Sequence, residues 1–240
     1  SKVFVMGIDG AFPEYIFGEW LDDLPNIKRL VHSGGYAKMK STDPPLSVTA
    51  WTSIYSGKSP TDTGIFEYVY RKNHSYSDMG VTTAQQMKEK TIWQIASEHG
   101  KKSAIAYMML TWPIKPFDGC IVTGSRTPSG DNVKSVYPDS LGEEIKAKIG
   151  EVFSSGSPQF RKMNTKEEVI DDMYRLTNRN FEVMEHILKT QEWELFFGMI
   201  PASDKMNHAF WKYMDKGHRK HEPNSKYANT LKDHYQMVDK

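Results

Sequence analysis

Two strongly apolar runs predict strands near the two ends of the chain. VFVMGI at residues 3–8 is apolar throughout, which is typical of a central strand covered on both faces of a sheet. LFFGMI at residues 195–200 is a second run of this kind. Shorter apolar runs predict further strands at residues 36–40, 104–110 and 120–123.

Helices are expected between these strands from their end signals and apolar spacing. Pro25 is expected to open one helix and Gly34 to close it. Thr165 and Glu168 have the spacing of a capping box, and apolar residues recur at helical spacing behind them as far as Ile187. Further helices are expected at residues 47–55, 92–99 and 204–214. Strands that alternate with helices predict an α/β fold, in which a largely parallel sheet carries helices on both faces.

Composition narrows the class of protein but not its function. The 240 residues carry a formal net charge of +1, so no broad nucleic-acid partner is expected. The single cysteine, Cys120, excludes an internal disulfide and permits a reducing compartment. No apolar run approaches the roughly 18 residues of a membrane span, so none is expected. We therefore expect a cytoplasmic protein, with export and removal of a leader as the alternative.

Two acidic residues follow the two apolar runs. Asp9 comes directly after residues 3–8, and Asp204 comes shortly after residues 195–200. Sites in parallel sheets lie at the carboxyl ends of strands, where these acids are expected. His208 follows Asp204 by one helical turn, so both side chains can reach one metal ion. The alternatives are an ordinary Asp-Gly turn at residue 9 and a helix cap at residue 204.

A hydroxyl residue stands at a predicted helix start. Ser47 follows the break at Pro44 and Pro45, where backbone N–H groups and the helix dipole favour an anion such as phosphate. Thr49 is a second hydroxyl two residues further on. The alternative is that Ser47 serves only as a helix cap.

Together these segments resemble a known family. The order is an apolar strand that ends at Asp9, then LPNIKRLVHSGGYAKMKSTDPPLSVTAWTSIYSGKSPTDTGIFEY, then IPASDKMNHAFWKYMD. This order resembles the type I phosphodiesterase and nucleotide pyrophosphatase branch of the alkaline phosphatase superfamily. The resemblance is good over residues 2–64, fair over 194–239 and looser between them. It implies an alkaline phosphatase-like three-layer sandwich, with inserted cap loops at about residues 65–90 and 111–138.

The resemblance also implies a catalytic site. Ser47, ten residues before Gly57, takes the place of the family nucleophile and forms a phosphoseryl intermediate. Asp9 and Ser47 are expected to serve one divalent metal ion, and Asp204 and His208 a second. Zinc is the expected metal, with manganese as the alternative. The implied activity is a metal-dependent phosphoester hydrolase, of the phosphodiesterase or nucleotide pyrophosphatase type, that acts on a small-molecule substrate.

One departure from the family pattern leaves alternatives open. The family completes its site with a later Asp-His pair, whereas Asp233–His234 lies in a polar stretch. We therefore expect a partial domain, residues 1–240, that is incomplete at its C-terminus, unless His218, His221 or His234 substitutes. The alternative functions are a phosphomutase or phosphotransferase of the same superfamily, and a non-catalytic fragment with an incomplete metal site. An incomplete sheet would expose an edge, so self-association is also expected.

Overall fold

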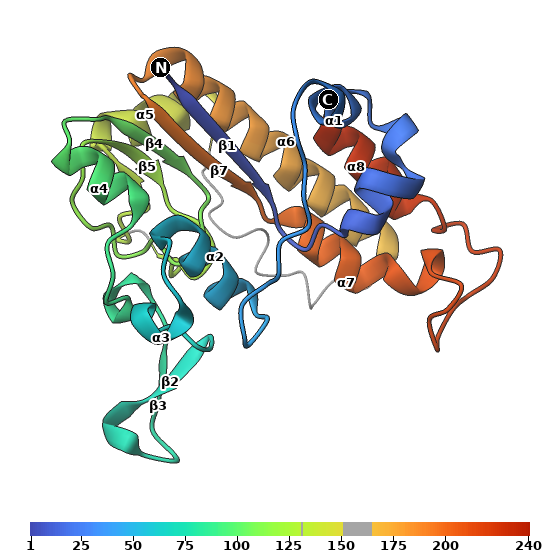
Figure 1. Cartoon of the computed structure of the whole chain (residues 1–240), viewed down its shortest axis with the longest axis horizontal. Helices are drawn as coiled ribbons and strands as arrows, with labels where there is room; N and C mark the ends of the chain where they lie inside the picture. Colours follow the sequence, from blue (N-terminus) through green and yellow to red (C-terminus); the bar gives the residue numbers. More distant parts are fainter. Residues whose placement is uncertain (131, 151–164) are drawn as a thin grey trace. The chain divides into compact units, whose positions relative to one another are not determined.

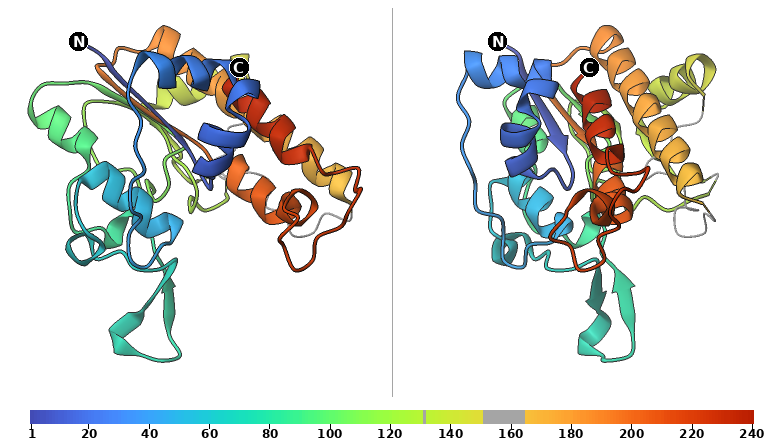
Figure 2. Two further views of the ribbon diagram at one scale, coloured as in Figure 1. Left: turned by 45° about the vertical axis from the view of Figure 1, so that its right-hand side comes forward. Right: turned by 90° about the vertical axis from the view of Figure 1, so that its right-hand side faces the viewer.

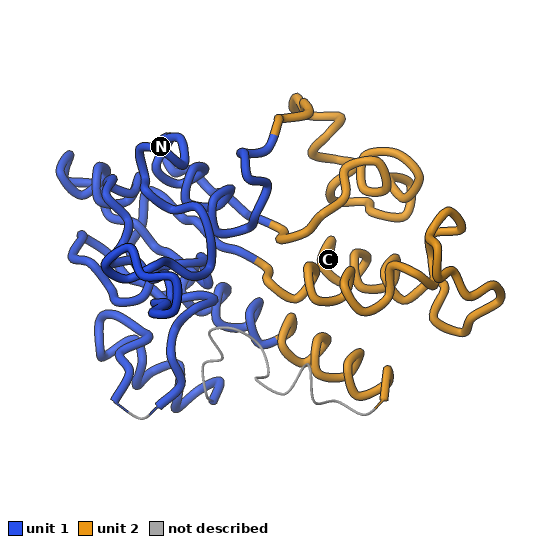
Figure 3. Tube along the Cα trace, turned by 90° about the horizontal axis from the view of Figure 1, so that it is seen from below, with its two compact units in different colours: residues 1–7, 41–155, 179–199 blue, residues 8–40, 156–178, 200–240 orange. Residues whose placement is uncertain are grey.

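The computed structural model describes residues 1–130, 132–150 and 165–240, which fold into two compact units (Figure 3). Unit 1 comprises residues 1–7, 41–155 and 179–199, and unit 2 comprises residues 8–40, 156–178 and 200–240. Three elements contribute residues to both units: β1 (Val3–Ile8), α6 (Lys166–Thr190) and β7 (Leu195–Ile200).

A five-stranded sheet has the order β1-β7-β4-β5-β6 (Figure 1). Its other strands are β4 (Ser103–Ala106), β5 (Gly119–Val122) and β6 (Val136–Tyr137). β4 runs parallel to β5 and to β7, whereas β6 is antiparallel to β5. The hydrogen bonds Val3 N–Glu194 O and Asp9 N–Ile200 O advance in step, as in parallel strands. The prediction of a largely parallel sheet is therefore confirmed.

Helices cover both faces of this sheet (Figure 1). The helices of unit 1 are α2 (Ser47–Ser56), α3 (Pro60–Thr63), η3 (Lys72–His74), η4 (Ala84–Gln86), α4 (Ile92–Glu98) and α5 (Asp139–Lys148). On one face, Phe197 of β7 shares a buried core with Tyr55 of α2 and Trp93 of α4. On the other face, Gly198 packs on α6. A Cβ atom added at Gly198 would lie 3.2 Å from the Met184 side chain. Because neighbouring β7 residues point to opposite faces, this one strand anchors both helical layers.

The strand at residues 3–8 forms as predicted, but it lies at the edge of the sheet. Val3 is 54% exposed and Phe4 is 51% exposed, so the expectation of a central strand covered on both faces is wrong. The Phe4 ring stacks on Phe196 of β7 at 5.0 Å between centroids. An apolar run can therefore arise from contacts with one neighbouring strand, and it does not show whether a second strand pairs on the other side.

Two other predicted strands differ from the structure. Residues 36–40 form no strand, and Tyr36 instead stacks on Phe17 at 5.3 Å. The strand predicted at 104–110 ends at Ala106, because Tyr107 has a φ of 61° and leaves the extended conformation. Short apolar runs therefore predict strands poorly, since contacts between side chains explain them as well as strand pairing does.

A β-hairpin occupies part of the segment predicted as the first cap loop. β2 (Val69–Arg71) pairs with β3 (Met79–Val81) as an antiparallel ribbon that projects from the rest of unit 1 (Figure 2). The segment at 111–138 contains β5 and β6, and its residue 131 lies outside the described residues. A role of either segment as a cap over a site stays a prediction.

Unit 2 is built from helices, and the sequence signals predicted α1 and α7 among them. Its elements include η1 (Tyr15–Glu19), η2 (Leu21–Asp23), α1 (Pro25–Ser33), α7 (Ala202–Met214) and α8 (Thr230–Asp239). α1 starts at Pro25 and is capped by Gly34, as predicted. The Asp239 carboxylate accepts hydrogen bonds from the backbone N–H groups of Asn26 (2.9 Å) and Ile27 (2.7 Å). The end of α8 therefore caps the start of α1.

The capping box at the start of α6 is confirmed. The Glu168 N–H donates to Thr165 Oγ1 at 3.2 Å, and the Thr165 N–H donates to Glu168 Oε2 at 3.3 Å. None of the described helices combines the length and the apolar composition that a membrane span requires.

His234 of α8 is part of the core of unit 2. Its side chain is fully buried, its Nε2 lies 3.1 Å from Ser203 Oγ, and its ring stacks on Tyr174 at 6.0 Å. Burial lowers the pKa of this imidazole to about 4, because the charged form loses its hydration. His234 is therefore held in its neutral form at neutral pH.

Substitution of Gly119 tests the β4–β5 pairing. Gly119 has a φ of 137°, and a Cβ atom there would lie 1.8 Å from Ser103 O. We expect Gly119→Ala to lower the free energy of unfolding by about 3 kcal/mol, since the new side chain is strained and clashes with backbone. Gly35→Ala is the control, because nothing lies within 4 Å of its Cβ position. Denaturant unfolding of both variants measures the difference, and equal midpoints would contradict the described pairing.

The burial of His234 makes the stability depend on pH. Its folded-state pKa of about 4 lies below the unfolded value of about 6.5, so the unfolded chain binds the extra proton first. The stabilisation is present above pH 6.5 and is lost as the pH falls toward 4. We expect a loss of about 2 kcal/mol between pH 7 and pH 5 that is absent in His234→Gln. Urea unfolding across this range measures it, and parallel pH curves for both proteins would refute the assignment.

Candidate active site

Asp9 lies at the point where β1 ends. Its N–H donates to Ile200 O, at the end of β7, at 3.1 Å, and its side chain is only 7% exposed. Gly10 follows with a φ of 69°, in the left-handed region that glycine adopts freely. The turn after β1 therefore places a buried carboxylate beside the carboxyl end of β7.

Asp204 approaches the same turn from the first turn of α7. A Cβ atom on Gly10 would lie 2.9 Å from Asp204 Cα and 3.1 Å from its Oδ1. A larger residue at position 10 would push α7 away from the turn. Gly10 is therefore required both by its backbone conformation and by the close approach of Asp204.

His208 completes a pair with Asp204 on one face of α7. The distance from His208 Nε2 to Asp204 Oδ1 is 3.6 Å, and the side chains are 74% and 34% exposed. Two ligands bound to one tetrahedral zinc at about 2.1 Å stand about 3.4 Å apart. The pair therefore fits a shared ion with little rearrangement, and an imidazole with a carboxylate is a donor set that suits zinc.

Two residues that the sequence reasoning missed lie against this group. Asn207 donates through Nδ2 to Gly10 O at 2.6 Å and to the Tyr235 hydroxyl at 3.2 Å. Tyr235 is 1% exposed, and its pKa is raised to about 12, chiefly by burial and further by the negative charges of Asp204 and Asp9. Asn207 lies about one helical turn after Asp204, but nothing in the sequence pointed to its contact with Gly10 or to Tyr235.

Ser47 belongs to unit 1, where it is the first residue of α2. Its side chain is half-buried, at the end of the helix where backbone N–H groups lack partners within the helix. The Thr49 hydroxyl is fully buried and lies 2.8 Å from Pro44 O and 2.7 Å from Leu46 O. Thr49 therefore stabilises the turn before α2, and Ser47 is the less buried of the two residues.

The histidines considered as substitute ligands make other contacts. His221 Nδ1 lies 3.0 Å from Lys212 O, and His218 Nδ1 accepts from the Lys220 N–H at 3.1 Å. His234 is buried beside Ser203, as described above. In the described part of the chain, no three or more His, Cys, Asp or Glu side chains gather to hold a metal ion. None of these histidines therefore joins Asp204 and His208 in a larger group.

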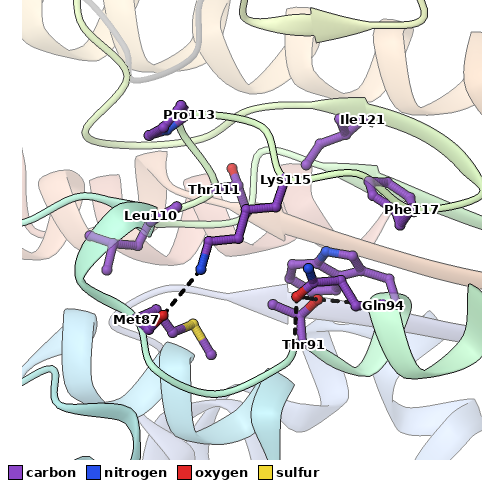
Figure 4. A pocket seen from close by; sticks show the side chains of 11 residues that line it. Met87, Thr91, Gln94, Leu110, Thr111, Pro113, Lys115, Phe117 and Ile121 are labelled. Atoms are coloured by element: carbon purple, nitrogen blue, oxygen red, sulfur yellow. Dashed lines mark hydrogen bonds between the residues drawn. The ribbon is translucent and has the colours of Figure 1, made fainter. Parts of the chain in front are cut away.

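A separate pocket lies in unit 1 (Figure 4). Lys115 Nζ points into it and donates to Met87 O at 3.1 Å, and burial lowers the pKa of this amine. Apolar side chains form most of the lining: Ala84, Met87, Trp93, Leu110, Pro113, Phe117 and Ile121. None of the residues predicted from the sequence as site residues lines this pocket.

The structure pairs two of the four predicted site residues, Asp204 and His208, on α7. Asp9 directly precedes Gly10, the residue against which Asp204 packs in unit 2. Ser47 stands at a helix start in unit 1.

Comparisons with known proteins agree on the fold. Two crystal structures of phosphonoacetate hydrolase from Sinorhizobium meliloti 1021, with phosphonoacetate and with phosphonoformate, are similar at TM-scores of 0.55 and 0.57. Each is 14% identical to this chain, and the matches cover 98% and 99% of it. They cover 51% of each neighbour, so the chain spans about half the length of these structures. The alkaline phosphatase-like α/β fold expected from the sequence is confirmed.

Sequence comparison agrees with the resemblance found in the motifs. No curated protein sequence matches the chain. The family model for type I phosphodiesterase / nucleotide pyrophosphatase matches residues 3–240, nearly the whole chain. The chain therefore belongs to the type I phosphodiesterase / nucleotide pyrophosphatase family.

Proposed function

We propose that this protein is a metal-dependent phosphoester hydrolase in which Ser47 is the nucleophile. The observation that carries the proposal is the Asp204–His208 pair, 3.6 Å apart and packed on the turn that follows Asp9. This pair occurs in a chain of the type I phosphodiesterase / nucleotide pyrophosphatase family, where the fold places sites at the carboxyl ends of strands.

Two divalent ions are part of this proposal. Asp204 and His208 would hold one ion, and Asp9 and Ser47 would hold the second. Zinc suits ligands of oxygen and imidazole nitrogen, and manganese is the alternative. Bound ions supply positive charge that stabilises the phosphoryl oxygens during displacement.

The reaction itself would take place in two displacements at phosphorus. Ser47 Oγ loses its proton to solvent and attacks the phosphorus atom, the bond to the leaving oxygen breaks, and that oxygen takes up a proton to leave as the alcohol. A phosphoseryl ester remains. The N–H groups in the first turn of α2 donate to the phosphoryl oxygens, since a helix N-terminus favours an anion. Water then attacks the same phosphorus atom, the bond to Oγ breaks, and the Ser47 hydroxyl is restored.

The substrate class is proposed as small-molecule phosphoesters. A panel of nitrophenyl monoesters, nitrophenyl diesters and nucleotide pyrophosphates distinguishes the possibilities, and phosphonoacetate belongs in it because the neighbouring enzymes act on that compound. Transfer of the phosphoryl group to an added alcohol, in place of water, would instead indicate a phosphotransferase.

Removal of the nucleophile tests the mechanism. We expect Ser47→Ala to lower the turnover of the best substrate in this panel by at least about a thousandfold, with little change in stability, because no other residue then forms the covalent intermediate. Rapid-quench labelling with a ³²P substrate measures the phosphoseryl intermediate directly.

Ser53→Ala is the matched control for this experiment. Ser53 lies on the same helix, and its hydroxyl is buried without a hydrogen-bond partner, so its loss costs little. Turnover and labelling that survive in Ser47→Ala would rule out Ser47 as the nucleophile.

Removal of a ligand tests the metal assignment. We expect the wild-type protein to retain zinc after desalting and Asp204→Asn to retain about one ion fewer per chain, since the pair with His208 is then broken. Elemental analysis measures the content. Asp171→Asn removes an exposed acid on α6 and should leave the content unchanged. Equal zinc in Asp204→Asn and the wild type would exclude Asp204 as a ligand.

A further inference from the structure

Asn207 lies between the two members of the metal-binding pair, on the same helix. It follows Asp204 by three residues and directly precedes His208. Residues three apart on a helix are neighbours on its surface, so the Asn207 amide lies alongside the Asp204 carboxylate. From there it reaches across to the turn after β1, where Gly10 O accepts its hydrogen bond at 2.6 Å.

The orientation of the Asn207 amide follows from its partners. Gly10 O can only accept a hydrogen bond, so the amide nitrogen must face it. The same nitrogen lies 3.2 Å from the Tyr235 hydroxyl. A flipped amide would set two acceptor oxygens against each other at this short distance. The amide thus links three segments of unit 2: the turn at residue 10, α7 and α8.

This link crosses a close contact between the turn and α7, next to the contacts of Phe12 and Tyr15 with Trp211 of α7. Gly10 contributes no Cβ atom, and the position that one would take lies only 2.9 Å from Asp204 Cα. The turn and α7 are therefore in close contact, and the Asn207 amide supplies a directed hydrogen bond between them. Because Asp9 immediately precedes Gly10, a shift of this turn against α7 would also shift Asp9 against Asp204 and His208.

We propose that Asn207 is a positioning residue that holds the Asp9–Gly10 turn on α7 and thereby sets the spacing of the acidic and imidazole ligands. The inference rests on the proposed function, because it concerns the residues assigned there to divalent ions. Asn207 contacts neither ion nor substrate in this role. It acts through the geometry of Asp9, Asp204 and His208, in the manner of residues that orient metal ligands in other proteins.

A matched asparagine in the same unit allows a controlled test. Asn26 donates through Nδ2 to Asp239 O at 2.7 Å, an amide-to-carbonyl bond between α1 and α8 that involves none of the proposed ligands. Loss of either amide removes one such bond and should lower stability by a similar amount, about 1 kcal/mol. A difference between the two variants in metal binding is then specific to the site.

The experiment compares zinc binding by wild type, Asn207→Ala and Asn26→Ala, measured by competition with a chromophoric chelator. We expect Asn207→Ala to bind zinc 10- to 100-fold more weakly and Asn26→Ala to bind it as the wild type does. The visible absorption spectrum of the cobalt-loaded protein should change only in Asn207→Ala, since its ligand geometry is altered. Asn207→Ser, whose hydroxyl is too short to reach Gly10 O, should reproduce the loss if Asn207→Ala folds poorly.

The outcomes separate this inference from the function on which it rests. Zinc affinity and cobalt spectra in both Asn207 variants that equal those of the wild type would overturn the positioning role and leave the metal site intact. An equal loss of affinity in Asn26→Ala would overturn it too, because the effect would then be one of general stability. A wild-type protein that binds no zinc or cobalt would overturn the proposed function and, with it, this inference.

Discussion

The parallel pairing of β1 with β7 is the constraint on which the candidate site depends. Parallel strands end at the same edge of a sheet, so the residues that leave β1 and β7 emerge side by side. The Asp9 N–H reaches Ile200 O at 3.1 Å, and α7 starts two residues later at Ala202. Residues almost two hundred positions apart in the sequence are thereby brought into contact.

A second constraint acts where the two segments meet. Backbone pairing alone would leave room for side chains between the β1 turn and α7. Because Gly10 has no side chain, the turn and α7 approach each other more closely. The cost is that carboxylates gather near the buried Tyr235 hydroxyl, whose raised pKa reflects both burial and their charge. Such an arrangement adds little to stability, since a buried acid such as Asp9 is costly to desolvate. It is typical instead of a site that binds a cation or acts on a charged substrate.

The sequence predicted those parts of the fold that have local signals. Pro25 and Gly34 bound α1, and the capping box at Thr165 opens α6, because helix ends are set by nearby residues. The edge position of β1 was not predictable, since hydropathy does not count neighbouring strands. Asp204 and His208 were found by their helical spacing. Asn207 and Tyr235 were missed because their role arises from contacts with Gly10 and with each other, which only the tertiary fold creates.

On both α2 and α7, a residue proposed to take part in the chemistry lies near one that holds the helix in place. On α2, the Thr49 hydroxyl hydrogen-bonds to the carbonyls of the preceding turn. Ser47, two residues earlier, lies on a different face of the helix, because residues two apart do not face each other. On α7, Asn207 holds the β1 turn, while the adjacent His208 stays exposed. Hydrogen bonds from Thr49 and Asn207 to backbone carbonyls thus fix these elements next to the residues proposed for chemistry. Under the proposed function, metal binding would then need little reorganisation of α7 and the β1 turn.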